Sequence, residues 1–145
     1  MKVKDIMTKE VATLGIEDEL SLANDIMRLG RIRYLPVVSE ETLVGIISER
    51  DLFRSSLAQA LGYGNKDTRE VMKTLRIKDV MVQKVTTISP DLELGDAIAL
   101  MVERKIGCLP VVEDNRLIGL ITETDVLIQY CKDLGRCPKR GPGTG

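Results

Sequence analysis

The apolar residues of this chain form short runs and helical stripes, with no long continuous segment. Two five-residue runs, Leu43–Ile47 and Leu117–Ile121, have the length of buried strands. Each follows a Leu-Pro-Val-Val segment, Leu35–Val38 or Leu109–Val112, across a short polar turn, so we predict two β-hairpins. Ahead of each hairpin, apolar residues at helical spacing predict an amphipathic helix: Leu20, Ala23 and Met27 in the first case, and Leu94, Ala97 and Met101 in the second.

The chain is a tandem duplication of one unit. Residues 3–52 align with residues 77–126 without a gap, at a constant offset of 74, and roughly 19 of the 50 aligned positions are identical. In each copy an extended piece, Val11–Leu14 or Val85–Ile88, precedes the first helix, and a second helix follows the hairpin. We therefore predict a β-α-β-β-α unit, twice, in an α/β (α+β) fold. Because one copy has too few apolar faces to close a core, we expect the two to pack sheet against sheet around a pseudo-twofold axis, with equivalent clefts in pairs.

The repeat sets the expected boundaries along the chain. The first motif spans residues 1–61, a linker with a short helix over Asp67–Leu75 spans 62–76, and the second motif spans 77–134. The segment Gly62-Tyr63-Gly64-Asn65 should end the last helix of the first motif. Residues 135–145 contain four Gly and two Pro, so we expect a loose tail there.

Composition excludes several classes of function. The 145 residues contain no His, which removes the commonest general base, and no glycine-rich phosphate loop, so we do not expect an enzyme. A net charge of −1 gives little support for binding a nucleic-acid backbone. No apolar run is long enough to span a membrane and the N-terminus lacks a signal-peptide pattern, so we expect a cytoplasmic protein.

The chain has an odd number of cysteines, namely Cys108, Cys131 and Cys137. Three thiols without His do not make the four ligands of a structural zinc site, so we expect neither a metal nor a cofactor. Cys131 and Cys137 lie six residues apart. Two interpretations stay open for them: ordinary thiols, or a disulfide between the two or across a dimer.

The most informative polar residues stand where the second strand of each hairpin gives way to a helix. Ser48 with Asp51, and Thr122 with Asp125, each combine a hydroxyl with a carboxylate three residues later. One interpretation is a capping box, in which the two side chains bond the backbone at a helix start. The other is a ligand site, because a helix N-terminus attracts phosphate and a carboxylate accepts hydrogen bonds from a ribose diol. The spacing alone favours capping.

The segments around these residues resemble the cystathionine-β-synthase (CBS) domain family. Leu-Pro-Val-Val, the polar turn and Leu-Val-Gly-Ile-Ile-Ser-Glu-Arg-Asp-Leu match its motif, and Lys-Asp-Ile-Met looks like its usual opening. The resemblance covers residues 3–134 and implies a stand-alone CBS pair. It implies two clefts that bind AMP, ADP, ATP or S-adenosylmethionine, and association through helices into a disc-like dimer. It places the ribose-binding carboxylate at Asp51 and Asp125, and the accompanying hydroxyl at Ser48 and Thr122.

The resemblance also implies further residues of the clefts. Thr13 and Thr87 lie where family members present a hydroxyl from the first strand, although a Thr in a strand needs no ligand to explain it. Arg33 and Arg50 are candidate phosphate ligands, with solvated surface arginines as the alternative. Because the second repeat has neither arginine, we expect two sites of unequal affinity. Three residues before Leu-Pro in each repeat should line a cleft: Ile32, Arg33 and Tyr34, and Ile106, Gly107 and Cys108.

These residues and the resemblance together predict a regulatory module that senses cellular energy through an adenosine nucleotide. AMP is the first choice, ahead of ADP and ATP, because few basic residues surround the expected clefts. The alternatives are a dimeric interaction scaffold with vestigial clefts, and binding of S-adenosylmethionine or nucleic acid. We expect a homodimer, a regulated protein as partner, and no membrane association.

Overall fold

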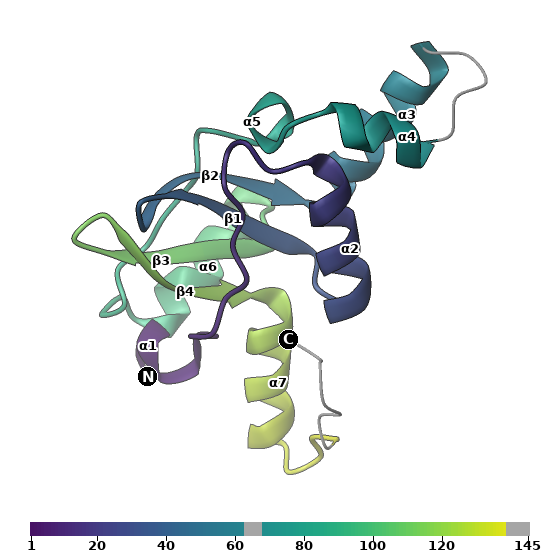
Figure 1. Cartoon of the computed structure of the whole chain (residues 1–145). Coiled ribbons are helices and arrows are strands. Elements are labelled where there is room, and N and C mark those ends of the chain that lie inside the picture. The colour runs from purple at the N-terminus through teal and green to yellow at the C-terminus, as the bar shows by residue number, and fades with distance from the viewer. Residues whose placement is uncertain (63–67, 139–145) are drawn as a thin grey trace. The chain divides into compact units, whose positions relative to one another are not determined.

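The computed structural model describes residues 1–62 and 68–138 and shows the predicted mixture of helices and strands (Figure 1). The hairpin strands extend one residue beyond each end of the predicted runs, and the short linker helix expected over Asp67–Leu75 spans Thr68–Thr74. Gly62 is the last helical residue before the expected break, whereas Tyr63, Gly64 and Asn65 and most of the expected tail fall outside the described residues. No helix in the described ranges has both the length and the apolar character that a membrane span requires. In chain order the elements are α1 (Val3–Ile6), α2 (Leu20–Gly30), β1 (Tyr34–Ser39), β2 (Thr42–Ser48), α3 (Glu49–Gly62), α4 (Thr68–Thr74), α5 (Ile77–Val80), α6 (Leu94–Arg104), β3 (Cys108–Glu113), β4 (Arg116–Thr122) and α7 (Glu123–Asp133).

Each hairpin closes through two residues with positive φ. β1 pairs antiparallel with β2, and β3 pairs antiparallel with β4 in the equivalent register. Glu40 and Glu41, with φ of 50° and 71°, turn the first hairpin, and Asp114 and Asn115, with φ of 51° and 65°, turn the second. Positive φ at both central residues is the geometry of a type I′ turn, whose twist matches the twist of the paired strands. The polar turns therefore form the predicted hairpins.

The extended piece ahead of the first helix of each repeat forms a single bridge and not a full strand. The Leu14 N–H donates to the Pro36 carbonyl at 3.0 Å, and the Leu14 carbonyl accepts from the Val38 N–H at 2.9 Å. A ladder continuing toward the N-terminus would need an N–H at Pro36, which proline lacks. Ile88 and Pro110 repeat this arrangement. Proline in the neighbouring strand thus limits the leading β of each predicted unit to one residue.

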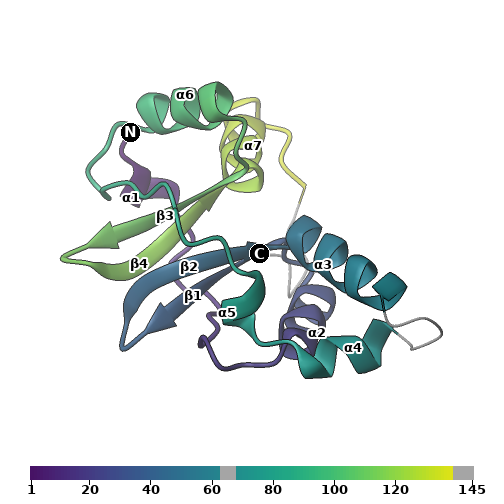
Figure 2. The ribbon, with the colours of Figure 1, turned by 90° about the horizontal axis from the view of Figure 1, so that it is seen from above.

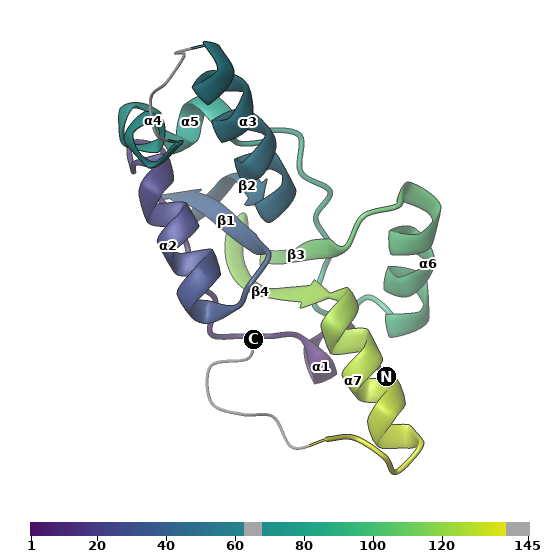
Figure 3. The same ribbon diagram turned by 90° about the vertical axis from the view of Figure 1, so that its right-hand side faces the viewer.

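The chain divides into two compact units, each with its own apolar core. The Asp51 unit consists of the described residues of Ala12–Val85, and the Asp125 unit combines Met1–Val11 with the described residues of Thr86–Pro142. Helices α2 to α5 accompany β1 and β2 in the Asp51 unit, and α1, α6 and α7 accompany β3 and β4 in the Asp125 unit (Figures 2 and 3). Fully buried side chains fill both cores, among them Leu20, Leu35 and Ile47 in the first and Val3, Leu109 and Ile121 in the second.

The two units exchange the opening segments of the repeats. Val3, at the start of α1, is buried in the Asp125 unit, where its N–H donates to the Leu92 carbonyl at 2.9 Å. Ile77 has the same position in the second repeat and is buried in the Asp51 unit, donating to the Asp18 carbonyl at 2.9 Å. Each unit therefore combines the helices and hairpin of one repeat with the opening segment of the other.

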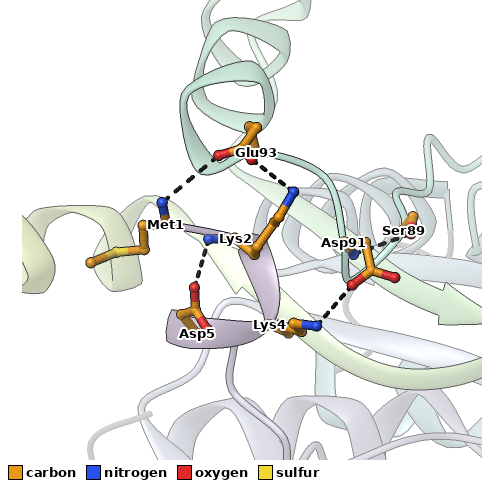
Figure 4. A network of polar contacts seen from close by, with 7 residues as sticks. All are labelled: Met1, Lys2, Lys4, Asp5, Ser89, Asp91 and Glu93. Atoms are coloured by element: carbon orange, nitrogen blue, oxygen red, sulfur yellow. Dashed lines mark hydrogen bonds and ion pairs between the residues drawn. The ribbon is translucent and has the colours of Figure 1, made fainter.

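Exposed ion pairs hold the first opening segment in the Asp125 unit (Figure 4). Lys2 Nζ lies 2.7 Å from Glu93 Oε1, and Lys4 Nζ lies 2.9 Å from Asp91 Oδ1. The hydrogen bond that each lysine donates to its carboxylate partner, followed by the charge of that carboxylate, raises the pKa of Lys2 and of Lys4. Because these groups are exposed, solvent screens the pairs, and burial of Val3 contributes more to fixing the segment.

Candidate ligand site

Two helix starts carry the residues that the sequence singles out. The Asp51 N–H donates to Ser48 Oγ at 3.0 Å, and the Ser48 N–H donates to Asp51 Oδ2 at 3.3 Å. Thr122 and Asp125 form the same two bonds at 3.3 and 2.9 Å. Both pairs are therefore capping boxes, as the spacing favours. The backbone bond engages only one oxygen of each carboxylate, so a ligand role is compatible with capping.

The two carboxylates differ in their surroundings. Asp125 is 6% exposed, and its Oδ1 accepts a hydrogen bond from Thr8 Oγ1 at 3.0 Å. Asp51 is half-buried, and no described residue donates a hydrogen bond to its Oδ1. The position of Thr8 in the first repeat corresponds to Val82 in the second, which has no hydroxyl to donate. Asp51 thus keeps acceptor capacity that Asp125 uses within the protein.

In the Asp51 unit, backbone contacts bring the residues before Leu-Pro to the start of α3. The Glu49 N–H donates to the Arg33 carbonyl at 2.7 Å, and Tyr34 lies opposite Ser48 in the hairpin register. Arg33 and Arg50 are both exposed. A hydroxyl, a carboxylate and two arginines therefore belong to the same turn and helix start, whose dipole favours an anion.

The Asp125 unit repeats this backbone arrangement with different side chains. The Glu123 N–H donates to the Gly107 carbonyl at 3.0 Å, and Cys108 lies opposite Thr122. Burial, with a further contribution from the charge of Asp125, raises the pKa of the Cys108 thiol to about 12. The thiol is therefore neutral near pH 7, and the second repeat has no arginine at the positions of the two in the first.

The remaining predicted residues differ in exposure. Thr13 and Thr87 are exposed and immediately precede the two bridging residues of the extended pieces. Ile32 and Ile106 are partly buried and pack against the two cores, with N–H bonds of 3.1 Å to the preceding helices. The ligand contacts expected of all four stay predictions.

Thr8 is a residue of the site that the sequence pattern did not single out. It lies 117 residues before Asp125 and reaches it only because the first opening segment packs in the Asp125 unit. The aligned residue, Val82, was an available signal, since the two repeats differ in polarity at this position. The alignment could not say which carboxylate the hydroxyl meets.

Cys131 and Cys137 are free thiols that lie next to each other at the end of α7. Desolvation, followed by the hydrogen bond to Cys137, raises the pKa of Cys131. A disulfide between them stays a prediction. Within the described ranges, no three side chains of His, Cys, Asp or Glu are grouped as metal ligands.

Known proteins are similar in sequence to this chain over most of its length. The family model described as the CBS domain matches residues 3–58 and 77–130. A CBS domain-containing protein of Dictyostelium discoideum is 32% identical over 138 residues, which are 94% of this chain and 95% of that protein. An inosine-5′-monophosphate dehydrogenase of Methanocaldococcus jannaschii is 36% identical over 128 residues, which are 87% of this chain. The match spans only 23% of that enzyme, and this chain spans 43% of a related Thermofilum pendens protein.

Some solved structures of the same fold contain adenosine compounds. The CBS domain pair of protein MJ0100, in complex with 5′-methylthioadenosine and S-adenosyl-L-methionine, has a TM-score of 0.76 at 28% identity, covering 92% of this chain and 98% of that one. CBSX2 in complex with AMP has a TM-score of 0.75 at 26% identity, covering 93% and 98%. The duplicated α/β fold is that of CBS domain pairs, a class of regulatory ligand-binding modules. The chain belongs to the CBS domain family and contains a pair of these domains, as its motifs predict.

Proposed function

We propose that this protein is a regulatory module that binds an adenosine nucleotide, with AMP as the first choice. The observation that carries the proposal is the Asp51 carboxylate, whose Oδ1 has no hydrogen bond from the described residues and which is held by Ser48 at the start of α3. A ribose diol can donate to this oxygen. Arg33 and Arg50 of the same unit supply guanidinium groups that match phosphate oxygens.

The charge of these residues favours a nucleotide over S-adenosylmethionine. The sulfonium of S-adenosylmethionine is cationic, and the compound has no phosphate to engage Arg33 or Arg50. The AMP complex of CBSX2 supports the nucleotide, whereas the MJ0100 complex keeps S-adenosylmethionine as the second candidate for the Asp125 unit, which lacks both arginines.

We further propose that the module is a cytoplasmic homodimer without catalytic activity of its own, and that it passes its ligand state to a regulated protein. Leu127, Tyr130 and Leu134 support association through helices, because they are 66%, 63% and 56% exposed at helical spacing along and just after α7. An exposed apolar stripe of this kind is typical of an interaction surface.

The test is isothermal titration of ligand-stripped protein with AMP, ADP, ATP and S-adenosylmethionine. We expect micromolar binding of AMP and weaker binding of ATP. If none of the four binds, the dimeric scaffold with vestigial clefts replaces the sensor, and capture of a protein partner becomes the relevant measurement.

A further inference from the structure

The Asp125 carboxylate already has hydrogen bonds of the kind that a ribose diol would supply. Its Oδ2 accepts from the Thr122 N–H at 2.9 Å and from Thr122 Oγ1 at 3.1 Å, which uses both lone pairs of that oxygen. Its Oδ1 accepts from Thr8 Oγ1 at 3.0 Å. Three of the roughly four acceptor positions of this carboxylate are therefore in use. The residue is only 6% exposed, so the Thr8 hydroxyl competes with a ligand hydroxyl for Oδ1.

Thr8 is the donor that a ligand could replace without opening the capping box. The Thr122 bonds hold the first turn of α7, whereas the Thr8 hydroxyl belongs to a separate segment. The Thr8 backbone stays fixed by bonds of 2.8 and 2.9 Å with Leu120, so rotation of its side chain alone would release Asp125.

The second repeat provides a natural comparison at this position. Val82 pairs with Ile46 through bonds of 3.0 and 2.9 Å, as Thr8 pairs with Leu120. The backbone arrangement is therefore the same in both units, and the side chain is what differs: a hydroxyl faces Asp125, whereas the residue aligned with it in the Asp51 unit has only methyl groups.

We propose that Thr8 is a positioning residue that occupies Asp125 in place of a ligand hydroxyl, so that the Asp125 site is the weaker of two unequal nucleotide sites. This inference rests on the proposed function. Nucleotide binding at Asp125 requires the Thr8 hydroxyl to give up its bond, and the free energy of that bond is subtracted from the affinity. Nucleotide binding at Asp51 has no such cost, because Val82 has no hydroxyl whose hydrogen bond must first be broken.

The experiment uses full-length protein and the substitution Thr8→Val, which has nearly the same shape and is the residue that the second repeat already carries. Thermal unfolding and isothermal titration with AMP are measured on the same samples, in the wild-type protein and in an Asp51→Ala background. In that background the Asp51 site is weakened, so that the Asp125 site contributes more of the measured binding. We expect Thr8→Val to lower the unfolding temperature and yet to raise the affinity of the Asp125 site about tenfold, the effect of one hydrogen bond to a charged group. A residue that only supported the fold would lower stability without raising affinity.

Two further variants serve as controls. Thr8→Ser keeps the hydroxyl and should restore the wild-type affinity. Val82→Thr should weaken AMP binding at the Asp51 site without lowering the unfolding temperature. The inference is overturned if Thr8→Val leaves the affinity unchanged or lowers it, or if no binding is measurable in Thr8→Val with Asp51→Ala. If the wild-type protein binds no adenosine ligand, the proposed function fails first and this inference fails with it.

Discussion

Asp51 and Asp125 show how two residues in the same repeat position acquire different chemistry. Both carboxylates accept a backbone N–H in a capping box, and that much depends only on the residue three positions earlier. The two carboxylates differ at the second oxygen. Asp125 accepts the hydroxyl of Thr8 from a distant segment, whereas Val82, the aligned residue of the other opening segment, has no hydroxyl. Capping is thus common to both sites, and ligand affinity is where they should differ.

Asp51→Ala should separate the ligand role from the capping role. We expect a ten- to hundredfold loss of AMP affinity, because a hydrogen bond to a charged group contributes about 1.5–3 kcal/mol. The lost cap should also lower the free energy of unfolding by about 1 kcal/mol. Titration and thermal unfolding of the same sample measure both.

The matched control is Asp79→Ala. Asp79 accepts the Arg76 N–H at 3.1 Å at the start of α5, as Asp51 accepts the Ser48 N–H at the start of α3. The Asp79→Ala variant should lose about as much stability as Asp51→Ala and should keep the wild-type affinity for AMP. Equal affinities in the two variants would mean that Asp51 only caps its helix.

Cys108 should be the slowest of the three thiols to react. Its pKa is raised to about 12 by burial, so the thiolate that a disulfide reagent needs is scarce at pH 8. Cys131 and Cys137 are only partly buried and should react first. Native protein treated with Ellman's reagent should therefore show two faster thiols and one slow one, and urea should make all three equivalent. A fast native Cys108, identified by mass spectrometry, would contradict this.

The same raised pKa predicts a loss of stability in alkali. The ordinary thiol pKa is 9.0, so the stability that the protonated Cys108 thiol contributes to the folded state is complete below about pH 9. It is lost as the pH rises toward 12. Cys108→Ala should therefore show a shallower loss of unfolding temperature above pH 9 than the wild-type protein. If the unfolding temperatures of the two proteins fall in parallel above pH 9, deprotonation of Cys108 does not cause the loss of stability.

At the scale of elements, two glycines explain how each opening segment crosses its strand. A Cβ at Gly119 would lie 2.8 Å from Met7 Sδ and 2.9 Å from the Thr8 carbonyl. A Cβ at Gly45 would lie 2.6 Å from Met81 Sδ and 3.0 Å from the Val82 carbonyl. Glycine weakens a strand interior, and here it allows close approach of another backbone.

Gly119→Ala should lower the free energy of unfolding by about 1–3 kcal/mol, the usual cost of overpacking. Because the backbone oxygen of Thr8 cannot yield as a flexible side chain does, the opening segment must shift. Gly95→Ala is the control, since a Cβ there would have no atom within 4 Å beyond its chain neighbours and the nearby backbone of its own helix. Alanine also favours a helix over glycine, by up to about 1 kcal/mol. Urea unfolding of the two variants should show shifts of opposite sign, and shifts of the same sign would refute the close-approach explanation.

At the scale of the whole molecule, the exchange of opening segments makes each folded unit depend on both repeats. Val3 and Ile77 are fully buried, each in the unit whose helices and hairpin come from the other repeat. A single repeat cut from the chain therefore lacks the segment that completes its own core and carries one that has nowhere to pack.

This dependence predicts the behaviour of fragments. Residues 1–75 and 12–85 are nearly equal in length, but only the second includes α5 with the Asp51 unit. We expect 12–85 to keep more helical circular dichroism and a steeper urea transition than 1–75. If 1–75 is the more cooperative of the two, the opening segment does not complete the core as described.

The sequence by itself determined the features that rest on short-range patterns. Hairpins follow from apolar runs and polar turns, capping boxes follow from Ser48 and Thr122 three residues before a carboxylate, and the CBS motifs identify the family. These contacts join residues close in the chain, so local periodicity and turn chemistry suffice to predict them.

Only the tertiary structure decided which opening segment meets which carboxylate. The repeat alignment contains Thr8 and Val82 as an unexplained difference, and the contact of Thr8 with Asp125 spans 117 residues. The same holds for the burial of Asp125 and for the single bridges at Leu14 and Ile88, which depend on the neighbouring strand. Contacts between distant segments are set by how whole elements pack, and no periodicity along the chain records that choice.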